Sequence, residues 1–239
     1  DPLPGAVRQR YGLVGRSEAY QAIHRPGSLH EMGEARRRLV FDELLRIQLA
    51  LVQRKVDLER SSVGIAHDVG VTALLDQFRS GLGFRMTAAQ DRVVGEILAD
   101  LARPAPMHRL LQGDVGSGKT GVAVAAMLAA VQGGHQAAVM VPTEVLAEQH
   151  HATISGLLDE MTVSDPATLL GHRPLKVDLL TSHTTAGERR RIGSQLLAGG
   201  VDVLIGTHAI IQEGVEFGSL GVVVIDEQHR FGVEQRAAL

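Results

Sequence analysis

The stretch RLLQGDVGSGKTGVAVAAMLAAV, which runs from Arg109 to Val131, decides how this chain folds. A short apolar run comes first, a glycine-rich break follows, and a second apolar run continues at a different period. The first run predicts a strand over 108–112, and the run after Lys119 predicts a helix that ends at Gly133-Gly134. A glycine-rich break between a strand and a helix is the setting of a phosphate-binding loop.

Residues 113–120 fit the pattern G-x-x-x-x-G-K-[ST] without deviation. Glycines let such a loop wrap with its backbone N–H groups pointing at an anion, and the helix N-terminus adds partial positive charge. Lys119, one of only three lysines in the chain, would reach the β- and γ-phosphates, and Thr120 would offer its hydroxyl to Mg²⁺. The alternative is a glycine-rich turn with a solvated lysine, which the flanking strand and helix disfavour. The predicted nucleotide-binding residues are Gly113, Asp114, Val115, Gly116, Ser117, Gly118, Lys119 and Thr120.

Two adjacent carboxylates end the later apolar run VVVIDEQH. Phosphoryl transfer needs a carboxylate on the metal side and a group that acts on water. Asp226 is placed to hold Mg²⁺, and Glu227 to act on the attacking water, so we expect Lys119, Asp226 and Glu227 to be the catalytic residues. Solvated turn residues would explain the pair of carboxylates equally well if no phosphate loop lay upstream.

Gln90 allows two interpretations. In MTAAQ, Thr87 and Gln90 have the spacing of a capping box, which would be a purely structural role. Gln90 could also recognise the adenine edge through its paired donor and acceptor, with Phe84 packing nearby. The two roles are compatible.

The chain as a whole reads as two regions. Residues 83–239 alternate strand and helix patterns, which indicates a parallel sheet covered by helices on both faces. Within them, 162–174 is expected to be a mobile surface insertion. Residues 1–82 are predicted to be helical, with a long helix over 29–58 that begins at a capping box of Ser28 and Glu31. Its wide apolar stripe fits either a well-buried core helix or a helix that connects two bodies. Its arginine run, 36–38, is expected to be solvated.

Composition excludes several classes of protein. The chain has no cysteine, which excludes disulfide frameworks and cysteine zinc sites and favours the cytoplasm. Its histidines, including His150-His151, lack the H-E-x-x-H spacing, so we expect no zinc site. No apolar stretch approaches the ~20 residues of a membrane span. The net charge of −3 argues weakly against a highly basic nucleic-acid module.

Several motifs taken together resemble the first motor domain of a RecG-type branch-migration helicase, a superfamily-two DNA translocase. They are FRMTAAQ, GDVGSGKT, VPTEVLAEQHH, LLTS and IGTHAIIQEGVEFGSLGVVVIDEQHRFGVEQR. The N-terminal YGLVGRSEAYQAIHRPGS resembles the segment that joins this family's DNA-binding wedge domain to its motor. Transcription-repair coupling factors share the motor type, but Ser117, Glu144 and Gln228 favour the RecG type.

The resemblance implies a RecA-like α/β domain that hydrolyses ATP with Mg²⁺ and remodels branched DNA, such as stalled forks and Holliday junctions, in recombination and repair. Gln228 and His229 would couple nucleotide state to DNA contact. The residues expected to face the DNA backbone are Pro142, Thr143, Glu144, Thr207 and His208.

The sequence departs from the family pattern at both ends. The wedge domain, the second motor domain and its arginine finger are not in these residues, so we expect a C-terminally incomplete motor that is inactive alone. Two other classes stay open. A P-loop ATPase unrelated to DNA, such as a transporter subunit, is disfavoured by DEQH and GTHA and by the lack of an LSGGQ-type signature. A non-catalytic nucleotide-binding module is the other.

Overall fold

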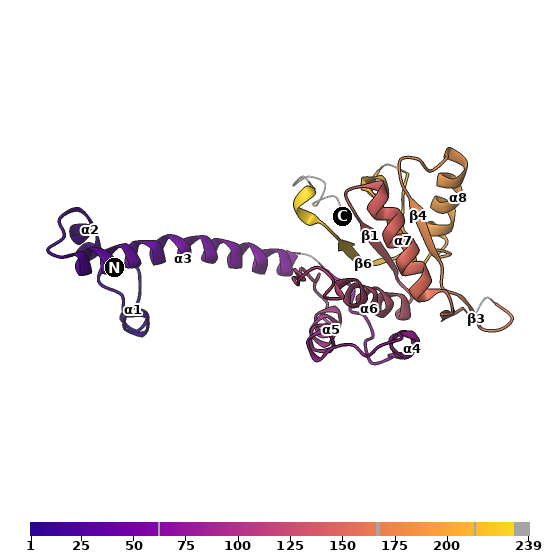
Figure 1. Cartoon of the computed structure of the whole chain (residues 1–239), viewed down its shortest axis with the longest axis horizontal. Helices are drawn as coiled ribbons and strands as arrows, with labels where there is room; N and C mark the ends of the chain where they lie inside the picture. The colour runs from indigo at the N-terminus through magenta and orange to yellow at the C-terminus, as the bar shows by residue number, and fades with distance from the viewer. Residues whose placement is uncertain (62, 166–167, 213, 232–239) are drawn as a thin grey trace. The chain divides into compact units, whose positions relative to one another are not determined.

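The computed structural model describes residues 1–61, 63–165, 168–212 and 214–231 (Figure 1). The chain divides into two units, Asp1–Ser62 and Val63–Leu239. The boundary expected from the sequence lay at residue 82. It moves toward the N-terminus because α4 (Ala73–Gly81) contributes Leu74, Leu75 and Phe78 to the core of the second unit.

The first unit consists of α1 (Gly5–Tyr11), α2 (Arg16–His24) and α3 (Leu29–Ser61) in its described part. The long helix starts at the predicted residue. The Glu31 N–H donates to Ser28 Oγ at 3.1 Å, while the Glu31 carboxylate accepts from the Gly27 N–H at 2.7 Å rather than from Ser28. Small buried side chains, Ala19 on α2 and Ala35 on α3, let two packed helices approach closely.

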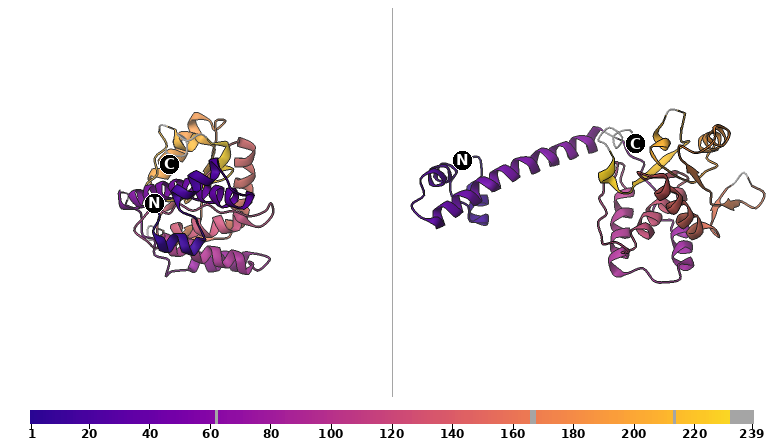
Figure 2. Two further views of the ribbon diagram at one scale, coloured as in Figure 1. Left: turned by 90° about the vertical axis from the view of Figure 1, so that its left-hand side faces the viewer. Right: turned by 45° about the horizontal axis from the view of Figure 1, so that its top comes forward.

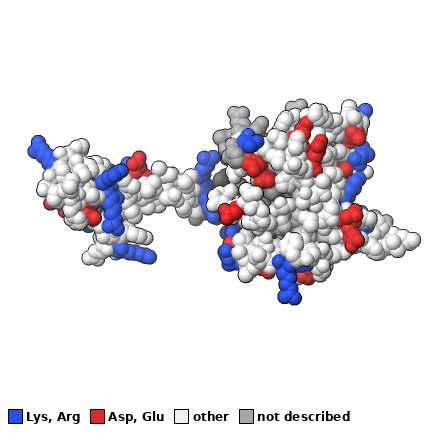
Figure 3. All heavy atoms as spheres, viewed as in Figure 1, with Lys and Arg blue, Asp and Glu red and all other residues white. Residues whose placement is uncertain are grey.

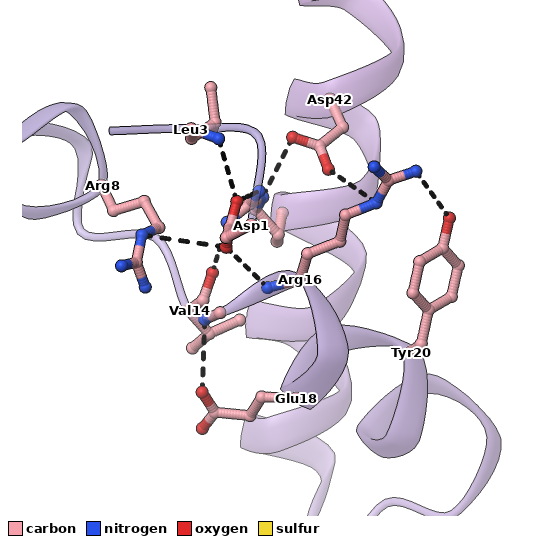
Figure 4. A network of polar contacts seen from close by, with 10 residues as sticks. Asp1, Leu3, Arg8, Val14, Arg16, Glu18, Tyr20 and Asp42 are labelled. Atoms are coloured by element: carbon pink, nitrogen blue, oxygen red, sulfur yellow. Dashed lines mark hydrogen bonds and ion pairs between the residues drawn. The ribbon is translucent and has the colours of Figure 1, made fainter. Parts of the chain in front are cut away.

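A buried arginine joins the helices of this unit. The completely buried Arg38 donates from Nε to Asp42 Oδ1 at 3.0 Å, and its terminal nitrogens donate to the Asp1 carboxylate and the Val14 carbonyl. Figure 4 shows that Arg16 contacts the same two carboxylates: its backbone N–H donates to Asp1 Oδ2, and its Nε lies 3.8 Å from Asp42 Oδ2. An arginine buried away from water is tolerated only when its N–H donors find hydrogen-bond acceptors, and those of Arg38 bind Asp1, Asp42 and Val14.

Two expectations for α3 are corrected. Of the arginine run, Arg36 and Arg37 are exposed as expected, but Arg38 is buried because it points at the carboxylates of the first unit. The reading of α3 as a well-buried core helix is wrong, since six of its large apolar side chains beyond the first turns are about half exposed. They are Val40, Leu44, Ile47, Leu49, Leu51 and Val52. The connecting-helix reading stays a prediction.

The second unit is an α/β domain, as predicted. Its helices, besides α4, are α5 (Ala88–Leu101), α6 (Lys119–Gln132), α7 (Glu144–Leu158), α8 (Ala186–Leu197), and the 3-10 turns η1 (His208–Ile211) and η2 (Gln228–Arg230). Its strands are β1 (Gln136–Met140), β2 (Thr162–Ser164), β3 (His172–Pro174), β4 (Val177–Leu180), β5 (Val203–Gly206) and β6 (Leu220–Ile225). Figure 2 gives two further views of their arrangement.

The main sheet has the strand order β4-β5-β1-β6, and every pair in it is parallel. Alternate residues of the strands point to opposite faces. In β1, Val139 joins the core beneath α4–α7, whereas Ala138 and Met140 join a second core with Ile192 and Leu196 of α8. Helices therefore cover both faces, which explains why the strands are apolar throughout.

Residues 108–112 do not form the predicted strand. A strand needs a hydrogen-bonded neighbour, which an apolar run alone does not supply. Arg109 instead pairs with Glu96 and Asp100 of α5, at 2.8 and 2.7 Å, and Leu110 is exposed.

The expected insertion at 162–174 has ordered ends. β2 and β3 pair as an antiparallel two-stranded ribbon, with Val163 opposite Arg173. Arg173 is held by Asp202, which accepts from both of its terminal nitrogens at 2.7 and 2.8 Å. Hydrogen bonding to Asp202 raises the pKa of Arg173. Residues 166–167 within this segment lie outside the described part.

Charge is spread unevenly over the surface. In the view of Figure 3, basic side chains line the edge of the second unit formed by α8, which carries Arg189, Arg190 and Arg191. Among the described residues, no helix combines the length and the apolar character that a bilayer span requires.

Candidate nucleotide site

The glycine-rich loop has the backbone that its sequence requires. Gly116 and Gly118 have φ values of 78° and 76°, in the left-handed region that other residues rarely adopt. The Ser117 N–H donates to the Asp114 carbonyl at 3.1 Å, which closes the turn. A Cβ on Gly113 would lie 2.7 Å from Ser117 Oγ, so a side chain there would require Ser117 to move. α6 begins directly after the loop, at Lys119.

Lys119 folds back over its own loop. Its Nζ donates to the Gly113 carbonyl at 2.8 Å and to the Asp114 carbonyl at 2.9 Å. A lysine has three donors and no acceptor, so it can release these carbonyls and turn to phosphate oxygens instead. Thr120 follows in the first turn of α6 and is half-buried. Val115, at the tip of the loop, is fully exposed.

Gln90 makes two sets of contacts. With Thr87 it forms the predicted capping box, in which the Gln90 N–H donates to Thr87 Oγ1 at 3.2 Å and Gln90 Oε1 accepts from the Thr87 N–H at 2.8 Å. Its Nε2 donates to the Ser117 carbonyl at 2.9 Å, which ties α5 to the phosphate loop. Phe84 is 64% exposed. The structural role of Gln90 is confirmed, and recognition of adenine stays a prediction.

Strand order brings the other predicted residues to one edge of the sheet. Asp226 follows β6, Pro142 to Glu144 follow β1, and Thr207 with His208 follow β5. The carboxyl ends of parallel strands share an edge. α6 packs on β1 and β6 and turns directly into β1, so the N-terminus of α6 lies at this same edge. Ligands of open α/β sheets bind at the carboxyl ends of the strands.

Both oxygens of the Asp226 carboxylate accept hydrogen bonds. Oδ1 accepts from the Glu227 N–H at 2.9 Å, and Oδ2 lies 2.9 Å from His150 Nε2 on α7. The Asp226 N–H donates to the Met140 carbonyl at 3.0 Å and so anchors the end of β6 to β1. Sequence reasoning considered His150 only as a zinc ligand. Nothing in its local spacing could have paired it with Asp226, which lies 76 residues further along the chain.

Glu227 has an unusual backbone. Its φ is 51° and its ψ is 42°, the sole left-handed conformation among the non-glycine residues that the structure describes. Such a conformation costs about 1–3 kcal/mol and gathers at functional sites. It starts the 3-10 turn η2, where Gln228 is exposed. The side chain of His229 lies outside the described part of the chain.

The residues predicted to face DNA differ in exposure. Thr143 and His208 are exposed, and Pro142 is half-buried. Thr207 is buried and its hydroxyl accepts from the Ala209 N–H at 3.5 Å, so in this conformation it caps η1 rather than facing solvent. None of these positions is a lysine or an arginine.

Glu144 is engaged within the protein. Its carboxylate accepts from the Ser182 N–H at 3.1 Å and from the Ser182 hydroxyl, and it lies 2.7 Å from His183 Nδ1. The hydrogen bond from the Ser182 side chain lowers the pKa of Glu144. The first residue of α7 is thereby tied to the loop after β4, which sequence reasoning had not connected.

The comparisons with known proteins agree with this geometry. The DEAD/DEAH box helicase family matches residues 87–239. Over its whole length the chain is 49% identical to the ATP-dependent DNA helicase RecG of Synechocystis sp. and 45% identical to that of Bacillus subtilis, spanning 27% and 33% of those proteins. A solved structure described as RecG bound to a three-way DNA junction superposes with a TM-score of 0.80 and 40% identity, over 97% of this chain and 30% of that one. The resemblance to RecG-type helicases is confirmed.

Proposed function

Because the chain belongs to the DEAD/DEAH box helicase family, we propose that it is the nucleotide-binding half of an ATP-dependent double-stranded DNA translocase that remodels branched DNA. The observation that carries the proposal is that the glycine-rich loop and the Asp226–Glu227 pair both lie at the carboxyl edge of one parallel sheet. The names of its RecG relatives support the DNA part of the proposal.

The residues at this edge fit ATP and Mg²⁺. A glycine-rich loop can offer backbone N–H groups, and Lys119 offers a positive charge, which together suit a triphosphate. Thr120 and Asp226 supply a hydroxyl and a carboxylate, the oxygen ligands that Mg²⁺ prefers. Bound Mg²⁺ would neutralise charge on the phosphate oxygens. Lys119 would then hold the phosphates, Glu227 would orient and deprotonate the attacking water, and Gln90 would read the adenine edge.

Coupling and DNA contact belong to the same proposal. Gln228 and His229 follow directly on Glu227, so a change in the backbone conformation of Glu227 on nucleotide binding would move these two residues first. Thr143 and His208 lie exposed at neighbouring strand ends, where contacts to phosphates would track a strand without reading its sequence. With a net charge of −3 the chain has little sequence-independent attraction for DNA, so the proposal assigns much of that contact to other domains.

The chain spans at most a third of the RecG proteins it matches, and the proposal gives the rest of the activity to a wedge domain and a second motor domain. Supplying an arginine finger is worth about 10³–10⁵ in rate in related phosphoryl-transfer systems. The chain alone should therefore bind adenine nucleotide weakly and turn it over negligibly. A cytoplasmic location is also part of the proposal.

Phosphate release from residues 1–239, with and without a forked duplex, tests this division. We expect binding of ATP without measurable DNA-stimulated turnover, and turnover only when the second motor domain is present. DNA-stimulated release of about one phosphate per second from the chain alone would contradict the need for a second motor domain. A chain that binds no nucleotide at all would contradict the site itself. A non-catalytic binding module predicts no turnover in the longer protein either.

A further inference from the structure

We propose that His150 is a positioning residue, whose imidazole holds the Asp226 carboxylate in the orientation from which it would face a nucleotide-bound metal ion. The inference rests on the proposed function, because it takes Asp226 to be the metal-side carboxylate. It adds to that function a residue on a different helix, which no motif assigned to the nucleotide site.

The contact itself has the geometry of a good hydrogen bond. His150 Nε2 lies 2.9 Å from Asp226 Oδ2. An ionised carboxylate only accepts hydrogen bonds, so Nε2 must carry the hydrogen and donate it. The His150 side chain is 18% exposed and that of Asp226 is 44% exposed. The imidazole is thus shielded, while the carboxylate keeps an open side.

Two donors on different oxygens fix the rotation of the carboxylate. Oδ2 accepts from His150, and Oδ1 accepts from the Glu227 N–H at 2.9 Å. Each carboxylate oxygen has about two lone-pair sites, so one site on each remains free. Without His150, only the neighbouring backbone N–H would restrain the carboxylate plane. Partners of this kind keep metal-binding carboxylates in position.

The position of His150 is set by the packing of α7. Ala147, Ile154 and Leu158 are buried along one stripe of this helix, and His150 falls between them at helical spacing. Thr143 caps the helix by accepting from the Leu146 N–H at 3.4 Å. The imidazole therefore stands on a rigid element rather than on a loop. A polar side chain in an apolar stripe needs a partner, and Asp226 provides it.

The test measures how nucleotide binding by the chain depends on Mg²⁺. A non-hydrolysable ATP analogue is titrated in EDTA and at increasing Mg²⁺. The variants are His150→Leu, which removes the donor, and His150→Gln, which can place an amide donor near the position of Nε2. His151→Leu is the matched control, because no described residue hydrogen-bonds to the His151 ring. Circular dichroism checks that each variant is folded.

We expect His150→Leu to raise about 10–100-fold the Mg²⁺ concentration at which nucleotide binding is half-maximally enhanced, while the affinity for the analogue in EDTA stays unchanged. His150→Gln should recover most of that loss, and His151→Leu should match the parent. A merely structural role would lower affinity equally with and without Mg²⁺.

Three results would overturn the inference, and they separate it from the proposed function. If the Mg²⁺ dependence of binding is unchanged in His150→Leu, the role of His150 is contradicted while the proposed function stands. An equal loss of affinity with and without Mg²⁺, unrelieved in His150→Gln, does the same. A parent chain that binds no analogue, or binds it with no response to Mg²⁺, contradicts the proposed function and this inference with it.

Discussion

Glu144, the first residue of α7, and His183, in the loop after β4, lie 2.7 Å apart between Oε2 and Nδ1. The same carboxylate also accepts from the Ser182 N–H, so three polar contacts join the start of α7 to the loop that follows β4. Glu144 was predicted to face DNA. Its carboxylate is hydrogen-bonded within the protein in this structure, and a contact with DNA stays a prediction.

Replacing Glu144 with glutamine should remove a pH-dependent part of the stability of the second unit. Because the Ser182 hydrogen bond lowers the pKa of Glu144 below its ordinary 4.5, the unfolded state binds the proton more tightly. The stabilisation is present above that value and is lost as pH falls through the lower, folded pKa. Thermal unfolding of parent and Glu144→Gln from pH 7 to pH 3 should show the parent losing more stability in acid. Parallel curves would contradict the prediction.

Lys119→Ala should abolish nucleotide hydrolysis in the longer protein and weaken nucleotide binding by the chain at least about tenfold. A charge-assisted hydrogen bond is worth about 1.5–3 kcal/mol, and this lysine would make its bonds to phosphate. The fold should survive, because the only hydrogen bonds of Nζ to described residues go to the carbonyls of Gly113 and Asp114. Lys55→Ala, in the first unit, is the control. Turnover within a few-fold of the parent would remove residues 113–120 from the catalytic site.

Glu227→Gln should slow hydrolysis by about 10²–10⁴-fold while nucleotide binding stays close to that of the parent, since the carboxylate acts on water. The measurement compares single-turnover phosphate release with nucleotide affinity in the longer protein. The left-handed backbone at Glu227 tolerates glutamine about as well as glutamate, so the variant tests chemistry rather than folding. A folded variant that fails to bind ATP would contradict the division of labour between Asp226 and Glu227.

Arg38→Met should destabilise the first unit by about 3–5 kcal/mol, because it removes the hydrogen-bond donor to the nearly buried carboxylate of Asp42 and the ion pair with Asp1. The adjacent Arg37 is 58% exposed, and Arg37→Met should cost less than about 1 kcal/mol. Urea unfolding followed by helical circular dichroism distinguishes the two. Equal effects of both substitutions would show that the buried network of Figure 4 contributes nothing specific.

Local features of this protein were accessible from its sequence. The phosphate loop follows from the glycines at 116 and 118, which alone adopt its left-handed turns without strain. The cap at Thr87 and Gln90 follows from their spacing within one turn of helix. The parallel sheet follows from apolar runs that alternate with helical ones. In each case the physical cause acts between residues that are close together along the chain.

Tertiary structure alone decided the rest. Burial of Arg38, the contact of His150 with Asp226 and that of Glu144 with His183 all depend on which elements become neighbours. The strand expected at 108–112 did not form for the same reason, since Arg109 pairs with α5 and no strand lies hydrogen-bonded beside these residues in the described part of the chain. The side chains of Ser182 and Glu144 are 38 residues apart and those of His150 and Asp226 are 76 residues apart, and both pairs meet because strand order places their elements at one edge. The spacing of residues along the sequence does not predict the strand order, because the packing of the whole domain determines that order.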